Sequence, residues 1–222
     1  MMRSLMAAAA VLAIAGSSAH AQSRDPRLAR LDPATATVIQ GIVDSVRPLG
    51  IPSEPIVDRA LYAAMKNAPG AQIVSIVRTR VRELASARAA LAPATESEII
   101  AGADAIRSGA TPETLGMLRR ARPSMELTVP IGVLADLIGR GVAADTAGAV
   151  IVQLASMDMR DRDLTEFRRM VDRDIALGAL PNAAVAIRAE AAGVNNLTAT
   201  EMSAPSTNRP PTAPRPIRPQ RP

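Results

Sequence analysis

The chain has 222 residues with a formal net charge of +5, and it contains no cysteine, no tryptophan and a single histidine, His20. The lack of cysteine excludes disulfide bonds, so packing alone must hold the fold together. It also excludes a cysteine nucleophile, and loss of His20 by the cleavage described next would exclude a Ser-His-Asp triad and an ordinary zinc site.

Residues 1–21 have the three parts of a secretory signal peptide. Arg3 supplies the positive charge, an apolar run covers residues 5–15, and Ala19-His20-Ala21 forms an A-x-A cleavage signal. The apolar run is too short to span a bilayer. The alternative is a buried core helix that begins in this run, but the order of the three parts favours export. We therefore expect cleavage after Ala21, a periplasmic or secreted protein, and no membrane span.

The rest of the chain reads as a polar lead-in over residues 22–31, followed by a helical domain over residues 32–197. Within that domain, apolar residues recur with the helical period, and capping residues, prolines and glycines interrupt them at short intervals. No segment alternates as a strand would. The sequence thus predicts an all-α fold of about eight or nine short helices, packed as antiparallel hairpins. The starts that we can place lie at Asp32, Ser53, Thr95, Thr111, Thr128, Asp161 or Asp163, and Pro181, and a longer helix follows the break at residues 67–70. Thr95 and Glu98 have the spacing of a capping box.

A weak internal repeat marks three of the predicted turns: Gly109-Ala-Thr-Pro, Gly141-Val-Ala-Ala and Gly178-Ala-Leu-Pro. Glycine accepts the left-handed conformation that ends a helix, and proline fits the first turn of the next one. The repeat could reflect a short, irregular helical-repeat stack with a concave binding face. The alternative is that the same favourable helix-stop and helix-start residues are used at several unrelated turns. The unequal spacing slightly favours this second interpretation.

Carboxylates are densest in the segment that holds Asp158, Asp161, Asp163 and Glu166. A calcium loop of the EF-hand type would need alternating ligands and a glycine at its sixth position, whereas arginines interleave here. We interpret the segment as an acidic helix start that is capped by Asp163 together with Glu166. We predict no catalytic, metal-binding or cofactor-binding residue, and no cofactor.

Residues 198–222 are rich in proline and arginine and are expected to form a disordered tail. Its four arginines, Arg209, Arg215, Arg218 and Arg221, account for most of the net positive charge and are candidate contacts to anions. Because the helical body is close to neutral, we expect no binding to nucleic acid. The tail could instead bind an envelope protein or an anionic envelope polymer, or it could be an inert solubilising end.

These observations favour an exported, non-enzymatic interaction module of the bacterial envelope. The alternative is a protein that binds a small ligand or a lipid in a cavity between its helices. A hydrolase that uses a pair of carboxylates is the least favoured hypothesis, since the acidic residues are spread over helix starts, where caps and helix dipoles account for them.

Overall fold

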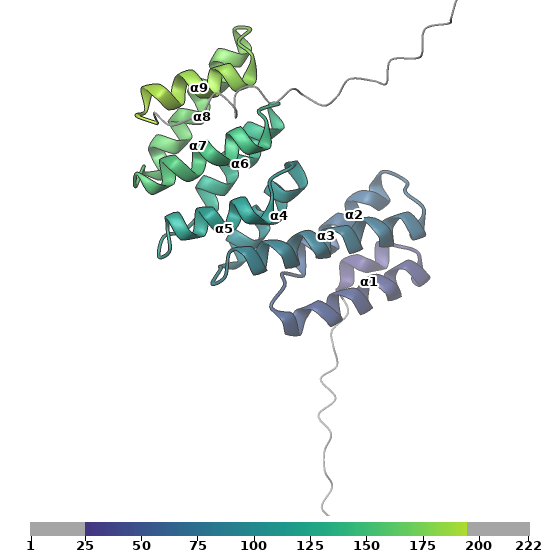
Figure 1. Cartoon of the computed structure of the whole chain (residues 1–222). Helices are drawn as coiled ribbons and strands as arrows, with labels where there is room; N and C mark the ends of the chain where they lie inside the picture. Colours follow the sequence, from purple (N-terminus) through teal and green to yellow (C-terminus); the bar gives the residue numbers. More distant parts are fainter. Residues whose placement is uncertain (1–24, 195–222) are drawn as a thin grey trace, which may run out of the picture.

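A computed structural model describes residues 25–194 of the chain, so the predicted signal peptide and the predicted tail lie outside the described residues. Between these limits the chain forms nine α-helices and two short 3₁₀-helices, η1 and η2, and it has no strand (Figure 1). This confirms the all-α prediction. In chain order the elements are η1 (Pro26–Arg30), α1 (Pro33–Val46), η2 (Arg47–Leu49), α2 (Glu54–Met65), α3 (Gly70–Ala90), α4 (Glu96–Ser108), α5 (Pro112–Ala121), α6 (Thr128–Gly139), α7 (Ala144–Ser156), α8 (Asp161–Ala176) and α9 (Pro181–Ala191).

Side-chain caps begin several helices at the predicted residues. Asp32 accepts a hydrogen bond from the backbone N–H of Thr35 at 2.9 Å, and Thr95 and Glu98 form the predicted capping box at the start of α4. Two helix starts differ from the prediction. Ser53 lies at the N-cap of α2 without a side-chain hydrogen bond. The N-cap of α8 is Arg160; of the acidic residues predicted to cap that helix, Asp161 and Asp163 lie inside its first turn and Glu166 lies in its second.

The correction at α8 has a physical reason, because its acidic side chains are held by arginines. Asp163 accepts a hydrogen bond from Nε of Arg160 at 2.9 Å, and Asp161 pairs with Arg122 at 3.0 Å. Both acids still lie where the helix dipole favours negative charge.

From α3 onward the helices alternate between two layers, and within a layer each helix packs on the one two places later in the chain. One layer runs from α1 through α3, α5 and α7 to α9, and the other runs from α4 through α6 to α8. Hairpin contacts between α3 and α4, α6 and α7, and α8 and α9 join the layers. Figure 1 shows the resulting row of helices, with α1 and α9 at opposite ends. This is the contact pattern of a helical-repeat stack, the first of the two interpretations of the turn repeat.

The predicted turn chemistry is confirmed at all three repeats. Gly109, Gly141 and Gly178 have φ angles of 118°, 90° and 100°, in the region that glycine adopts without steric cost. Each of them ends a helix of the α4–α6–α8 layer and leads into the next helix of the other layer.

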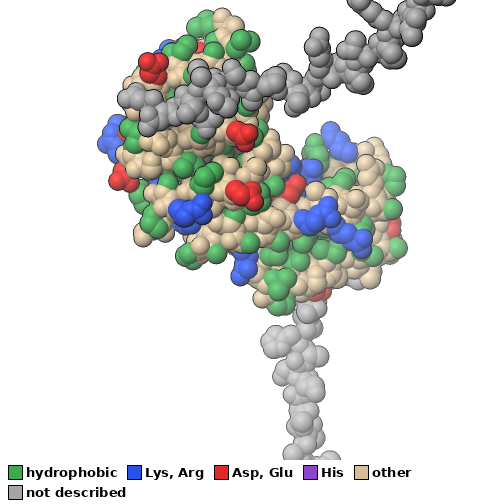
Figure 2. Space-filling view, in the orientation of Figure 1, with side chains coloured by type: hydrophobic (Ala, Val, Ile, Leu, Met, Phe, Trp, Pro, Cys, Tyr) green, Lys and Arg blue, Asp and Glu red, His purple; other side chains and the backbone are tan. Residues whose placement is uncertain are grey.

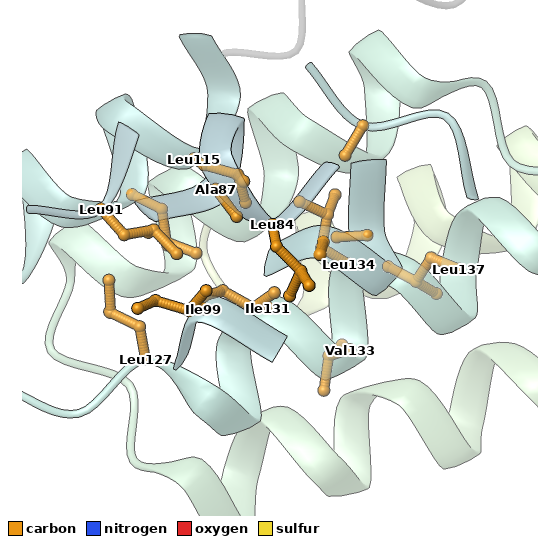
Figure 3. Close-up of a cluster of buried hydrophobic side chains, with 14 of the residues drawn as sticks. Leu84, Ala87, Leu91, Ile99, Leu115, Leu127, Ile131, Val133, Leu134 and Leu137 are labelled. Carbon is orange, nitrogen blue, oxygen red and sulfur yellow. The ribbon is translucent and has the colours of Figure 1, made fainter. Parts of the chain in front are cut away.

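The buried apolar side chains form one continuous core between the layers. Figure 3 shows its central part, where aliphatic side chains of α3, α4, α5 and α6 converge. The helices approach closely there, since a Cβ atom added at Gly102 of α4 would lie 2.8 Å from Leu91 and 2.9 Å from Ala87. None of the helices between residues 25 and 194 combines the length and the apolarity that crossing a membrane requires.

Part of the predicted polar lead-in belongs to the packed body. Asp25 accepts a hydrogen bond from the backbone N–H of Arg27 and begins η1, which packs on α1 and α2. Leu28 of η1 is completely buried and belongs to the core. The α1 end of the helical stack is thus covered by η1, which belongs to the segment predicted as a polar lead-in.

Candidate functional site

The best candidate site is a cleft between α2 and α4, with α3 as its floor. α4 packs closely on α6, and α6 on α8, but α2 is held mainly by α3 and has no comparable contact with α4. Figure 2 shows the surface hollowed between the part built from α1–α3 and the rest of the stack, with charged side chains on both sides. The cleft has a volume of about 360 Å³. It is lined by Glu54, Pro55, Asp58, Arg59 and Tyr62 of α2, Arg80 of α3, and Ile100 and Arg107 of α4.

The floor of the cleft is organised by Arg80, whose side chain is only 5% exposed. Its guanidinium pairs with Asp104 of α4 at 2.9 Å and with Glu83 of α3 at 3.3 Å. Asp104 receives a second guanidinium, that of Arg107, at 3.0 Å on the same oxygen. One carboxylate oxygen is therefore shared by two arginines, and Asp104 and Glu83 together balance the two positive charges.

The α2 side of the cleft carries the chain's single tyrosine, Tyr62, which is 53% exposed. The Arg59 guanidinium lies 5.9 Å from the centre of its ring, and the Lys66 ammonium lies 5.7 Å from it. Such contacts hold a cation against an aromatic face without neutralising its charge. Neither cation pairs with a carboxylate in the described part of the chain, so both keep their charge available to a ligand, although only Arg59 lines the cleft.

The other end of α2 is acidic. Glu54 and Asp58 both bind Nη1 of Arg27, at 3.0 and 3.1 Å, and Arg27 also pairs with Asp25 at 2.8 Å. The hydrogen bonds to Asp25 and, second, to Glu54 raise the pKa of Arg27, and the contact with Arg27 lowers the pKa of Asp25. Acidic residues at the start of a helix and basic ones at its end also suit the helix dipole. The cleft thus has an acidic and a basic end.

A second depression, of about 480 Å³, lies over the side chains of Glu98 and Arg119. These two side chains form an ion pair with each other, so neither charge is available to a ligand. Glu98 is buried and accepts hydrogen bonds from Arg119 at 2.6 Å, from the Leu127 N–H at 2.8 Å and from the Thr95 N–H at 2.9 Å. Burial raises the pKa of Glu98, but these bonds outweigh it, and the pKa falls below its ordinary value. This group ties three segments together, which is a structural role.

Most carboxylates of the described residues pair with an arginine. Glu98 is the one acidic residue among the buried side chains between residues 25 and 194, so the pair of converging buried acids that a hydrolase would need does not occur there. The segment 25–194 also has no group of three or more acidic residues that could hold a metal ion. Three members of the acidic cluster identified in the sequence pair with different arginines: Asp161 with Arg122, Asp163 with Arg160 and Arg162, and Glu166 with Arg169.

The predicted anion contacts Arg209, Arg215, Arg218 and Arg221 lie outside the described residues, so they stay a prediction. Sequence reasoning missed the cleft, whose residues come from three helices. One signal was available, because Tyr62 lies three residues after Arg59 and four before Lys66, on the face of α2 away from its buried apolar stripe.

Comparison with known proteins adds no family assignment: no family model matches the chain, and neither a curated protein nor a solved structure is significantly similar to it.

Proposed function

We propose that this protein is a non-enzymatic interaction module, exported to the bacterial envelope, and that the cleft between α2 and α4 binds an extended segment of a partner protein. The observation that carries the proposal is the exposed Tyr62 between two cations that lack a carboxylate partner in the described residues. Exposed aromatic and arginine side chains in a cleft are the residue types that contribute most to protein interfaces. Export rests on the three-part leader over residues 1–21.

The dimensions of the cleft suit a short stretch of extended chain. The row of lining residues from Glu54 to Tyr62 covers two turns of α2, or roughly 12 Å. About four residues of extended peptide cover that length. An acidic side chain of such a segment can pair with Arg59 while a neighbouring apolar side chain packs on the Tyr62 ring. Because the cleft is lined by both acidic and basic side chains, it suits a polypeptide, which can carry both kinds of charge, better than a uniform polyanion.

Selection from a displayed library of random peptides tests this proposal. Peptides that bind the protein should be rich in acidic residues next to apolar ones. Tyr62→Ala and Arg59→Ala should each weaken their binding by about tenfold, as expected for the centre of an interface. Arg78→Ala is the matched control, because Arg78 is exposed and, two residues before Arg80, lies on the opposite side of α3.

Two results would count against the cleft. Binding that survives both α2 variants would place the peptide elsewhere on the molecule. Binding that weakens equally in Arg59→Ala and Arg78→Ala would show general attraction to positive charge rather than recognition.

The arginines of residues 198–222 provide a proposed second contact, to anionic groups of the envelope. Attraction between exposed charges is screened over roughly 8 Å at physiological salt, so this contact should weaken as salt is added. A chain that ends at Met202 should lose binding to anionic vesicles at low salt, with no change in melting temperature. Equal vesicle binding by the shortened chain would remove the tail from the proposal.

A further inference from the structure

The α9 end of the helical stack presents an apolar face to solvent that corresponds to a buried face in the preceding repeats. The three repeated turns lead into α5, α7 and α9, so residues can be matched by counting from the first residue of each helix. The third, seventh and eleventh positions are Thr114, Leu118 and Arg122 after the first turn; Thr146, Val150 and Leu154 after the second; and Ala183, Ile187 and Ala191 after the third.

In the first two repeats this face is buried, and in α5 it contacts the following helix. Thr114 of α5 faces α7, because a Cβ atom added at Gly148 would lie 2.9 Å from Cγ2 of Thr114. All three matched positions after each of these turns are buried. Gly148 is the fifth position of α7, and the fifth position of α9, Val185, is completely buried.

In α9 the same face is open. Ile187 is two residues after Val185 and so lies on the opposite side of the helix, where it is 60% exposed. Ala183 and Ala191, one turn before and one turn after it, are exposed too. Leu180, at the N-cap of α9, is 75% exposed. Within residues 25–194 no helix follows to cover this face, although η1 covers α1 at the opposite end of the stack (Figure 1).

We propose that this face, formed by Ala183, Ile187 and Ala191 and called the α9 stripe below, binds the α9 stripe of a second copy of the chain. The α9 stripe is symmetric about Ile187, with an alanine four residues away on each side. In an antiparallel pair of α9 helices related by a two-fold axis, Ile187 therefore meets Ile187, and each alanine meets the alanine at the other end. The contact continues the series of α5–α7 and α7–α9 contacts inside the chain.

The charges near α9 permit this pairing. The α9 stripe itself has no charged residue, and Arg188, beside it, is held by Asp174 at 2.6 Å. Glu190, three residues after Ile187, is exposed at the edge of the α9 stripe, and the antiparallel arrangement places it beside the start of the partner's α9, where the helix dipole favours negative charge. A two-fold contact of one face with itself also closes as a dimer, whereas a contact between α9 and the opposite end of the stack would build an open filament. One short helix buries less than the roughly 800 Å² per partner of a stable complex, so the dimer should be weak and depend on concentration.

Sedimentation equilibrium of the full chain tests the proposal. The wild-type protein should move from monomer toward dimer as its concentration rises to about 500 µM, because weak interfaces of this size need high concentration. Ile187→Arg should stay monomeric over that range. Leu49→Arg is the matched control, since Leu49 is a 56% exposed leucine of η2, outside the α9 stripe, and this variant should behave as the wild type.

Cysteine variants test the geometry, since the chain has no cysteine of its own. On mild oxidation Ile187→Cys should form a disulfide-linked dimer much faster than Leu49→Cys. A mixture of Ala183→Cys and Ala191→Cys should form the mixed dimer in preference to either homodimer. A wild-type chain that stays monomeric at every concentration, or an Ile187→Arg variant that dimerises like the wild type, would overturn the proposal.

Discussion

Glu98→Gln is the substitution whose effect the structure specifies most closely. The carboxylate lies between the start of α4, the end of α5 and the loop before α6, and it accepts three hydrogen bonds with almost no exposure to solvent. Glutamine keeps the size of the side chain but removes the charge. Its amide nitrogen would also face one of the three donors, because Thr95 N–H, Leu127 N–H and Arg119 all need an acceptor.

The expected loss of unfolding free energy comes from Arg119, which the substitution leaves without its carboxylate partner. Arg119 is 11% exposed, and removing its partner leaves a cation that is largely withdrawn from water. Breaking a buried ion pair in this way costs about 3 to 5 kcal/mol. Because glutamine can still accept from Arg119 through its oxygen, we expect the lower end, about 3 kcal/mol. In a domain of this size each kcal/mol lowers the melting temperature by about 2 to 4 °C, which gives a decrease of about 6 to 12 °C.

Denaturant unfolding followed by far-UV circular dichroism measures this loss. Glu96→Gln is the control, because Glu96 occupies the same first turn of α4 but is exposed and should cost less than about 1 kcal/mol. The pH dependence gives a second check. The pKa of Glu98 is lowered on folding from an ordinary value of 4.5, so its stabilisation is fully present above that pH. It is lost as the pH falls through the pKa of the folded state, and the two proteins should then converge.

If Glu98→Gln and Glu96→Gln cost the same within about 0.5 kcal/mol, the usual scatter of surface substitutions, the reasoning is refuted. A difference that persists unchanged at low pH would instead assign the loss to packing, and it would refute the part of the argument that rests on charge.

Three further predictions rest on other features. In the same denaturant assay, Gly148→Ala should lower the unfolding free energy by about 1 to 3 kcal/mol, because the new Cβ would press on Thr114. Gly132→Ala is the control: there is open space around Gly132, so alanine should raise the unfolding free energy by up to about 1 kcal/mol. Melting curves with and without dithiothreitol should coincide, since there is no disulfide to reduce, and curves with and without a chelator should coincide as well. Mass spectrometry of the protein from its native host should give the mass of a chain that begins at Gln22, and an intact Met1 would contradict the predicted cleavage.

Local signals in the sequence place the starts and ends of most helices. Caps, first-turn prolines and left-handed glycines act on the backbone within a few residues, so Asp32, Thr95 and Gly109 could be assigned roles that the structure confirms. The all-α class followed for the same reason, because the period of the apolar residues is a local property.

Which side chains meet depends on how the helices pack against one another. Nothing near Glu98 in the sequence indicates that Arg119 and the Leu127 N–H will bind it, and the cleft beside Tyr62 exists because α2 packs on α3 without a comparable contact to α4. The exposure of Ile187 could not be predicted from the sequence, for a related reason. Its residue type matches that of the buried Leu118 and Val150, and only its place on the last helix of the described stack leaves it open. Burial depends on which helix comes next in space, and a local pattern does not contain that information.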